Sequence, residues 1–276
     1  MKPFKKAAII GTGLIGGSLA LAIKKRRLAK EVVGVSRHAR NIALAKRRGV
    51  IDKGSVSLEV IRDADLVIFA APVDVIKKLA PKAAKFLNKN CIVTDVGSTK
   101  QEIVSCLEKI FPLFVGSHPL AGSEKRSVAN AQMDLFRNSL CILTPTRKTN
   151  RKALRALNIF WKKVGANTEF LSPDAHDTVL GFVSHLPHIA AFSLIEAVPK
   201  NYLRFAASGL KDTTRIAASD SELWAQIFLS NRRNLSAAIA ILEKNITKIK
   251  KALRRNNIKQ LSRILKEAKA KREILA

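Results

Sequence analysis

The sequence contains few aromatic residues, few cysteines and few acidic residues, and each shortage narrows the possible functions. Aromatic residues make up 5% of the 276 positions, with one Tyr and two Trp, so stacking platforms for single-stranded nucleic acids are scarce. Cys91, Cys106 and Cys141 form no C-x-x-C pair. This pattern argues against a disulfide framework and a structural zinc site, and it fits a reducing compartment. We expect no metal site.

Long uninterrupted apolar runs are also missing, and none approaches the roughly 18 residues of a membrane helix. One stretch, Ala7 to Ile23, is mostly apolar and has basic residues on both sides, as in an export signal. Four glycines interrupt it, and Lys24 to Arg27 follow it where a signal peptide would have a small-residue cleavage site. We therefore expect a cytoplasmic protein that does not associate with membranes.

Acidic residues are outnumbered by basic ones, 21 against 50, which gives a formal charge of +29. The electric field of this positive charge attracts anions, so a basic nucleic-acid-binding protein on a dinucleotide-binding fold is one alternative. The basic residues are densest from Lys244 to Ala276, where twelve Lys and Arg accompany two Glu. Apolar residues from Leu235 to Leu253 recur there at helical spacing, which places the lysines on a solvated face. We favour this interpretation over a nucleic-acid partner.

Strand-like and helical segments alternate through the first 170 residues or so. The predicted strands are Ala7–Ile10, Val32–Ser36, Leu66–Ala70, Cys91–Val96, Leu113–Gly116, Leu140–Thr144 and Thr168–Leu171. The predicted helices are Leu14–Arg27, Asn41–Arg48, Asp74–Leu87, Thr99–Ile110 and Asn150–Val164. Several strands are continuously apolar, as expected for parallel strands covered on both faces. The pattern predicts a Rossmann-type doubly wound α/β sheet.

The pattern changes at Ser172-Pro173, where Ser172 can cap a new helix that has Pro173 at its first position. Helical segments follow to the end of the chain, with breaks expected near Pro187, Pro199, Gly209 and Asn256. We therefore predict a dinucleotide-binding domain over residues 1–172 and a separate all-α domain over residues 173–276.

A G-x-G-x-x-G motif joins the first predicted strand to the first helix. Gly11 allows a tight turn, Gly13 lets the backbone approach a pyrophosphate, and Gly16 permits close helix–strand packing. Free N–H groups at the helix start then bind the anion. The predicted cofactor site comprises Gly11, Thr12, Gly13, Leu14, Ile15 and Gly16, together with Pro72 after the third predicted strand.

The end of the second predicted strand carries no acidic residue. NAD sites usually place Asp or Glu there to bind the ribose 2′-hydroxyl. Ser36 and Arg37 occupy these positions. The Ser36 hydroxyl can donate a hydrogen bond to a 2′-phosphate, and the Arg37 guanidinium can form an ion pair with it. We predict NADP or NAD as cofactor, with NADP favoured.

Polar residues concentrate in four further segments, T94DVGSTK100, G116SHPLAGSE124, S184HLPH188 and K211DTTRIA217. Together with G11TGLIGGS18, these ordered motifs resemble the prephenate and arogenate dehydrogenase family, from the glycine loop to the region of Trp224. The resemblance implies a two-domain oxidoreductase of the 6-phosphogluconate-dehydrogenase-like kind, whose helical domain forms a homodimer. It also implies oxidative decarboxylation of prephenate to 4-hydroxyphenylpyruvate in tyrosine biosynthesis.

The resemblance and the chemistry of prephenate together assign roles to residues. His118 is the expected acceptor for the C4 hydroxyl. Ser98 holds the same hydroxyl or the nicotinamide amide, and it can also cap the following helix. Arg215 is the first choice as carboxylate anchor, and His188 faces the pyruvyl side chain. The remaining predicted substrate-binding residues are Ser123, Glu124, Ser184 and Lys211.

Two further histidines, His176 and His185, are expected to have structural roles. His185 is assigned mainly to structure, and His176, which follows Pro173-Asp174-Ala175, to the start of a helix rather than to a metal site. The alternatives that remain are arogenate as substrate, another β-hydroxyacid-type dehydrogenase, and the nucleic-acid binder. The last would show a salt-dependent gel shift.

Overall fold

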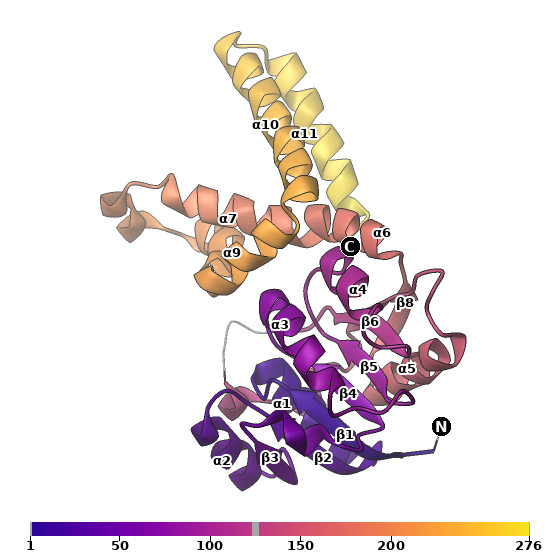
Figure 1. Ribbon diagram of the computed structural model, residues 1–276. Helices are drawn as coiled ribbons and strands as arrows, with labels where there is room; N and C mark the ends of the chain where they lie inside the picture. Colours follow the sequence, from indigo (N-terminus) through magenta and orange to yellow (C-terminus); the bar gives the residue numbers. More distant parts are fainter. Residues whose placement is uncertain (1, 123–126, 276) are drawn as a thin grey trace.

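The computed structural model describes residues 2–122 and 127–275. Its N-terminal half is built on an eight-stranded sheet with the order β3-β2-β1-β4-β5-β6-β7-β8 (Figure 1). The strands are β1 Phe4–Ile10, β2 Ala29–Val35, β3 Lys53–Ser55, β4 Leu66–Phe69, β5 Ile92–Asp95, β6 Phe114–Pro119, β7 Leu140–Thr144 and β8 Asn167–Phe170. Strands β1 to β6 are parallel, β7 is antiparallel to β6, and β8 is parallel to β7. The predicted doubly wound sheet is confirmed.

Helices cover both faces of this sheet because successive strand residues point to opposite sides. The helices are α1 Leu14–Lys25, α2 Ala39–Arg47, α3 Val73–Ala84, α4 Gln101–Leu107 and α5 Arg151–Val164. Ala7 and Ile9 pack in one core with α1, α2 and α5, whereas Ala8 and Ile10 pack in the other with α3 and α4. Burial on both sides explains the continuous apolar runs in the strands.

Every regular element that the structure describes after Pro173 is helical. These elements are α6 Pro173–Leu180, a π-helical turn Gly181–His185, α7 Leu186–Glu196, α8 Ser208–Thr214, α9 Ser221–Ser230, α10 Arg232–Arg254 and α11 Ile258–Glu273, with short 3₁₀ turns at Lys200–Phe205 and Arg215–Ala218. The Ser172 hydroxyl accepts from the Ala175 N–H at 3.1 Å, as predicted for the cap of α6. Helices α10 and α11 form a hairpin that extends away from the sheet (Figure 1).

Three details of the predicted secondary structure are wrong. The short edge strand β3 was not predicted, because three residues carry too little periodicity. Helix α4 begins at Gln101 rather than near Thr99. Pro187 does not break the chain into two helices, since it lies in the first turn of α7 directly after the π-helical turn. A π turn widens the helix locally and accommodates such irregularities.

The continuous helix Pro173–Glu196 corrects the expectation from apolar runs. It has 24 residues and an 18-residue window with a mean hydropathy of 1.5, so by length and composition it could cross a membrane. Only 22% of that window is buried. The same helix carries His176 and Asp177, which are buried and hydrogen-bonded, so one of its faces packs against the N-terminal half.

Candidate functional site

The predicted site loops converge at one edge of the sheet. In the parallel register, Ile10 at the end of β1 pairs with Phe69 of β4, and Phe69 pairs with Asp95 of β5. The glycine loop, the turn at Pro72 and the loop that carries Ser98 therefore extend beyond the same carboxyl edge. Strand β6 runs in the same direction and brings His118 to this edge. Ligands of open α/β sheets bind at such an edge.

The glycine loop has the shape of a dinucleotide cradle. Gly11 has a φ of +111°, and a Cβ there would lie 2.2 Å from the Ala70 carbonyl oxygen. A Cβ on Gly16 would lie 2.0 Å from the Gly11 oxygen, whereas a Cβ on Gly13 would meet nothing within 4 Å. Gly13 therefore faces open space at the start of α1, where a pyrophosphate can approach the backbone N–H groups. This geometry is compatible with the three roles predicted for the motif's glycines, which stay a prediction.

A second observation supports a ligand at the glycine loop. The Thr12 side chain is 3% exposed, and its hydroxyl oxygen is buried without a hydrogen-bond partner among the described residues. Buried hydroxyls normally have a partner, so this atom fits a site that a ligand completes. Leu14 is buried and Ile15 half-buried behind the loop, and Pro72 is exposed where it precedes α3.

Ser36 and Arg37 follow β2, one strand away from the glycine loop. Ser36 is half-buried, and its hydroxyl accepts from the Asn41 side-chain amide at 3.5 Å. Arg37 is exposed, and its Nε donates to His38 Nε2 at 3.0 Å. Within the part of the chain that the structure describes, no hydrogen bond engages its two terminal amino groups, so they can bind an anion.

His118 lies on β6 opposite Ile142 of β7 and is 9% exposed. Its Nδ1 lies 2.9 Å from Nε2 of His176 on α6. Burial, together with nearby His176, Lys100 and His185, holds the pKa of His118 well below its usual value of 6.5. The imidazole is thus neutral near pH 7, which a proton acceptor requires.

Two charged residues beneath His118 were missed at the sequence level. The Lys100 ammonium group is completely buried against the Asp95 carboxylate, and it donates to the Ser117 carbonyl oxygen at 2.8 Å. Asp95 also accepts from the Gly97 N–H at 2.8 Å and from the Ser117 N–H at 3.3 Å. This pair fixes the backbone directly before His118. The motif letters included both residues, but nothing in them showed that Lys100 points inward.

His176 and Asp177 were also missed. Both are buried on α6, and His176 Nδ1 lies 2.8 Å from the Asp177 Oδ1. The same carboxylate accepts from the Lys100 N–H at 2.7 Å and the Gln101 N–H at 2.9 Å. Asp177 therefore caps α4, and the idea that Ser98 caps this helix is wrong. The Asp-Ala-His-Asp sequence at a helix start does not show that its side chains contact the segment before α4 and the end of β6.

Ser98 stands between β5 and α4 and is half-buried at the carboxyl edge. Its neighbour Thr99 donates to the Ser230 hydroxyl at 3.1 Å, so this loop contacts the helical half of the molecule. Ser123 and Glu124 lie outside the described residues.

The helical half contributes a second group of polar side chains. The His188 ring stacks on Trp224 with centroids 3.4 Å apart, and its Nδ1 donates to the Ser184 carbonyl oxygen at 2.9 Å. Buried His185 accepts at Nδ1 from the Asn231 amide at 3.0 Å, which fits a structural role. Ser184 is half-buried, whereas Arg215 and Lys211 are exposed on neighbouring turns.

Burial and neighbouring charges lower the pKa of both histidines in this group. Burial lowers the pKa of His188, and the positive charge of Arg215 lowers it further. Burial lowers the pKa of His185 to about 4, with His176 and His188 adding to the shift. His185 thus affects the pKa of His118, His188 affects that of His185, and Arg215 affects that of His188.

Comparison with known proteins assigns this arrangement to a family. Residues 19–170 match the family model "Prephenate dehydrogenase, nucleotide-binding domain", and residues 172–267 match "Prephenate dehydrogenase, dimerization domain". The chain belongs to the prephenate dehydrogenase family. This family of nicotinamide-dependent oxidoreductases is the one that the five motifs indicate, so the predicted fold, enzyme class and family are confirmed.

Individual relatives extend the match over nearly the whole chain. A prephenate dehydrogenase of Bacillus subtilis (strain 168) is 37% identical over 276 aligned residues, which cover 96% of this chain and 74% of the relative. The crystal structure of prephenate dehydrogenase from A. aeolicus with hydroxyphenyl propionate and NAD⁺ is 36% identical, with a TM-score of 0.93 over 99% of this chain and 98% of that one. The Synechocystis arogenate dehydrogenase structure is 27% identical, with a TM-score of 0.86 over 98% and 100% of the two chains.

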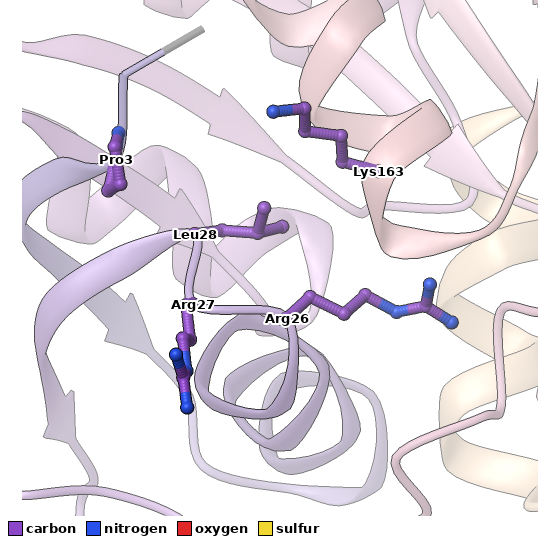
Figure 2. A pocket seen from close by; sticks show the side chains of 5 residues that line it. All are labelled: Pro3, Arg26, Arg27, Leu28 and Lys163. Atoms are coloured by element: carbon purple, nitrogen blue, oxygen red, sulfur yellow. The ribbon is translucent and has the colours of Figure 1, made fainter.

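Figure 2 shows a basic cavity of about 260 Å³. It is lined by Pro3, Arg26, Arg27, Leu28 and Lys163. Pro3 precedes β1 and Leu28 precedes β2, so the cavity lies at the amino ends of these strands. It is therefore at the edge opposite the glycine loop and His118, and it plays no part in the proposed chemistry.

Proposed function

We propose that the chain oxidises and decarboxylates prephenate, with hydride transfer from C4 to a nicotinamide cofactor and release of carbon dioxide. The observation that carries this proposal is His118, a buried neutral imidazole at the same carboxyl edge of the sheet that the glycine loop occupies. His118 takes the proton of the C4 hydroxyl as hydride leaves C4. Loss of the ring carboxylate supplies the electron pair that makes the ring aromatic, and the phenolic oxygen recovers a proton.

The residues at the edge fit a bound dinucleotide. Gly11, Gly13 and Gly16 provide the cradle, the Thr12 hydroxyl lacks a partner among described residues, and α1 offers free N–H groups at its start. When bound, the nicotinamide supplies a hydride acceptor. Ser36 and Arg37 support NADP over NAD, because they offer donors for a 2′-phosphate where NAD sites usually have a carboxylate.

The substrate carboxylates require cations near His118. Arg215 provides a planar fork for one carboxylate, and its electrostatic effect on His188 supports their proximity. His188 binds the pyruvyl side chain, and a carboxylate at its Nε2 would raise the pKa that burial lowers. Ser98 holds the C4 hydroxyl with His118. Ser184 and Lys211 belong to the proposed pocket, and the substrate-binding roles of Ser123 and Glu124, which lie outside the described residues, stay a prediction from the sequence.

Arogenate is a second candidate substrate, favoured by the likeness to the Synechocystis arogenate dehydrogenase structure. Arogenate differs from prephenate in its side chain, which His188 contacts in this proposal. Steady-state assays of each substrate with NAD⁺ and NADP⁺ decide between the possibilities. We expect the highest kcat/KM with prephenate and NADP⁺. A higher kcat/KM with arogenate would contradict the substrate assignment, and turnover of neither would contradict the function.

The assembly and its setting follow from the same family assignment. We propose a homodimer formed through the helical half, with the division between domains at residues 172 and 173. Exposed apolar side chains on that half, such as Val183, Phe205 and Leu229, support a covered face. We also propose a cytoplasmic location without membrane or nucleic-acid partners, which fits three free cysteines. Analytical ultracentrifugation tests the dimer.

A further inference from the structure

The Asp177 carboxylate fixes the proton position on its neighbouring imidazole. Its Oδ1 accepts from the Lys100 N–H at 2.7 Å and its Oδ2 accepts from the Gln101 N–H at 2.9 Å. Backbone N–H groups are donors only, so both oxygens of this carboxylate act as acceptors. The contact of 2.8 Å between Oδ1 and His176 Nδ1 therefore requires the proton on Nδ1 of the imidazole.

The proton position on His176 in turn determines that of His118. Burial lowers the pKa of both imidazoles, so both are neutral near pH 7. A neutral imidazole with its proton on Nδ1 has a lone pair on Nε2. His176 Nε2 lies 2.9 Å from His118 Nδ1, so His118 must donate there. Nε2 of His118 is then the atom left with a lone pair.

The exposure of the three side chains agrees with this direction. His176 is 0% exposed, Asp177 1% and His118 9%, so solvent access increases toward His118. The opposite tautomers would place the lone pair of His176 Nδ1 against the Asp177 carboxylate. Two acceptors at that distance repel each other, which makes the opposite arrangement unfavourable.

We propose that His176 and Asp177 are positioning residues that keep the proton of His118 on Nδ1 and thereby leave Nε2 as the acceptor for the substrate hydroxyl. This inference rests on the proposed function for its catalytic consequence. His176 and Asp177 touch neither substrate nor cofactor in it, and they act through His118.

The same carboxylate also joins the two halves of the molecule. Asp177 belongs to α6 of the helical half, while Lys100 precedes α4 and Gln101 begins it in the nucleotide-binding half. The interaction that docks α6 on α4 therefore also sets the tautomer of His118. His118 becomes a competent acceptor when the two halves are docked at this point.

Substitutions at positions 176 and 177 test the catalytic consequence. Asp177→Asn and His176→Leu should lower kcat by about 10²- to 10⁴-fold, the range of general base catalysis, with KM for prephenate changed less than about 3-fold. His176→Gln should recover part of the loss, because its amide oxygen can accept from His118 Nδ1. Asp174→Asn is the matched control, since Asp174 is exposed and contacts the Gln101 side chain at 3.1 Å. It should retain the parent kcat.

A direct measurement on the unsubstituted protein keeps the test valid if a variant fails to fold. The chain has five histidines, so ring ¹⁵N spectra of histidine-labelled protein are simple, and His118→Asn assigns the His118 signals. We expect the proton of His118 on Nδ1, whether or not prephenate is the substrate. A proton on Nε2, or equal kcat for Asp177→Asn and Asp174→Asn, would overturn the proposal. Absence of prephenate turnover would instead contradict the proposed function.

Discussion

The Lys100 ammonium group and the Asp95 carboxylate form an ion pair that is completely excluded from solvent, directly beneath the backbone of Ser117 and His118. Asp95 ends β5, Lys100 precedes α4, and His118 lies on β6. Three segments that carry site residues are thus held together by one pair of charges. Its integrity affects both the stability of the fold and the electrostatics of His118.

Removing Lys100 should therefore be costly. Lys100→Met leaves the Asp95 carboxylate buried without its cation, and we expect the free energy of unfolding to fall by about 3–5 kcal/mol. Lys77→Met is the matched control, because its pair with Glu102 at 2.6 Å is partly exposed. The control should cost about 1 kcal/mol or less. Urea denaturation of both variants measures the difference, and equal costs would show that the buried pair is not special.

The lowered pKa of His118 predicts the pH dependence of catalysis. The groups that face His118 are Lys100 and Asp95, His176 and Asp177 on α6, His185 on the π-helical turn, and the Cys141 thiol. Burial raises the pKa of the Cys141 thiol. The neutral imidazole is the active form, so kcat at saturating prephenate, where His188 already binds the substrate, should be constant from about pH 6.5 to 8 and decline only below a pKa well under 6.5. An inflection above pH 6.5 that vanishes in His118→Asn would contradict this environment.

Arg215→Ala should separate binding from chemistry. Loss of the guanidinium removes a carboxylate contact that exists before and during the reaction, so KM for prephenate should rise at least 10-fold while kcat changes little. Arg263→Ala provides the control, since Arg263 is an exposed residue of α11. If both variants have the parent KM, Arg215 is a surface residue without a substrate contact.

Arg37→Ala should change cofactor selection. The exposed guanidinium next to Ser36 is the proposed partner of a 2′-phosphate, so KM for NADP⁺ should rise at least 10-fold with little change for NAD⁺. Arg47→Ala, at the other end of α2, should leave both values unchanged. Equal weakening with NAD⁺ and NADP⁺ would mean that Arg37 supports the fold instead of selecting the cofactor.

Local sequence patterns were sufficient for most of the fold. The glycine loop, the apolar strands and the Ser172 cap each depend on neighbouring residues, so they could be predicted from short segments. The edge strand Lys53–Ser55 and the helix that continues through Pro187 could not be predicted in this way. Both depend on pairing or packing with distant parts of the chain.

The site was predicted in part for the same reason. His118 and the glycine loop lie in recognisable motifs at strand ends. His176, Asp177 and the inward direction of Lys100 have meaning only where segments 95–100, 117–118 and 176–177 meet in space. A histidine near a helix start, taken alone, carries no signal of a second imidazole across the domain boundary.

Kinetics of His118→Asn test the central claim, that His118 accepts the proton of the substrate hydroxyl, most directly. Rapid mixing of the variant with NADP⁺ and prephenate measures hydride transfer in a single turnover, and calorimetry measures prephenate binding in parallel. We predict a rate lowered by about 10²- to 10⁴-fold, with prephenate affinity within a few-fold of the parent. Hydride transfer at the parent rate would contradict the account.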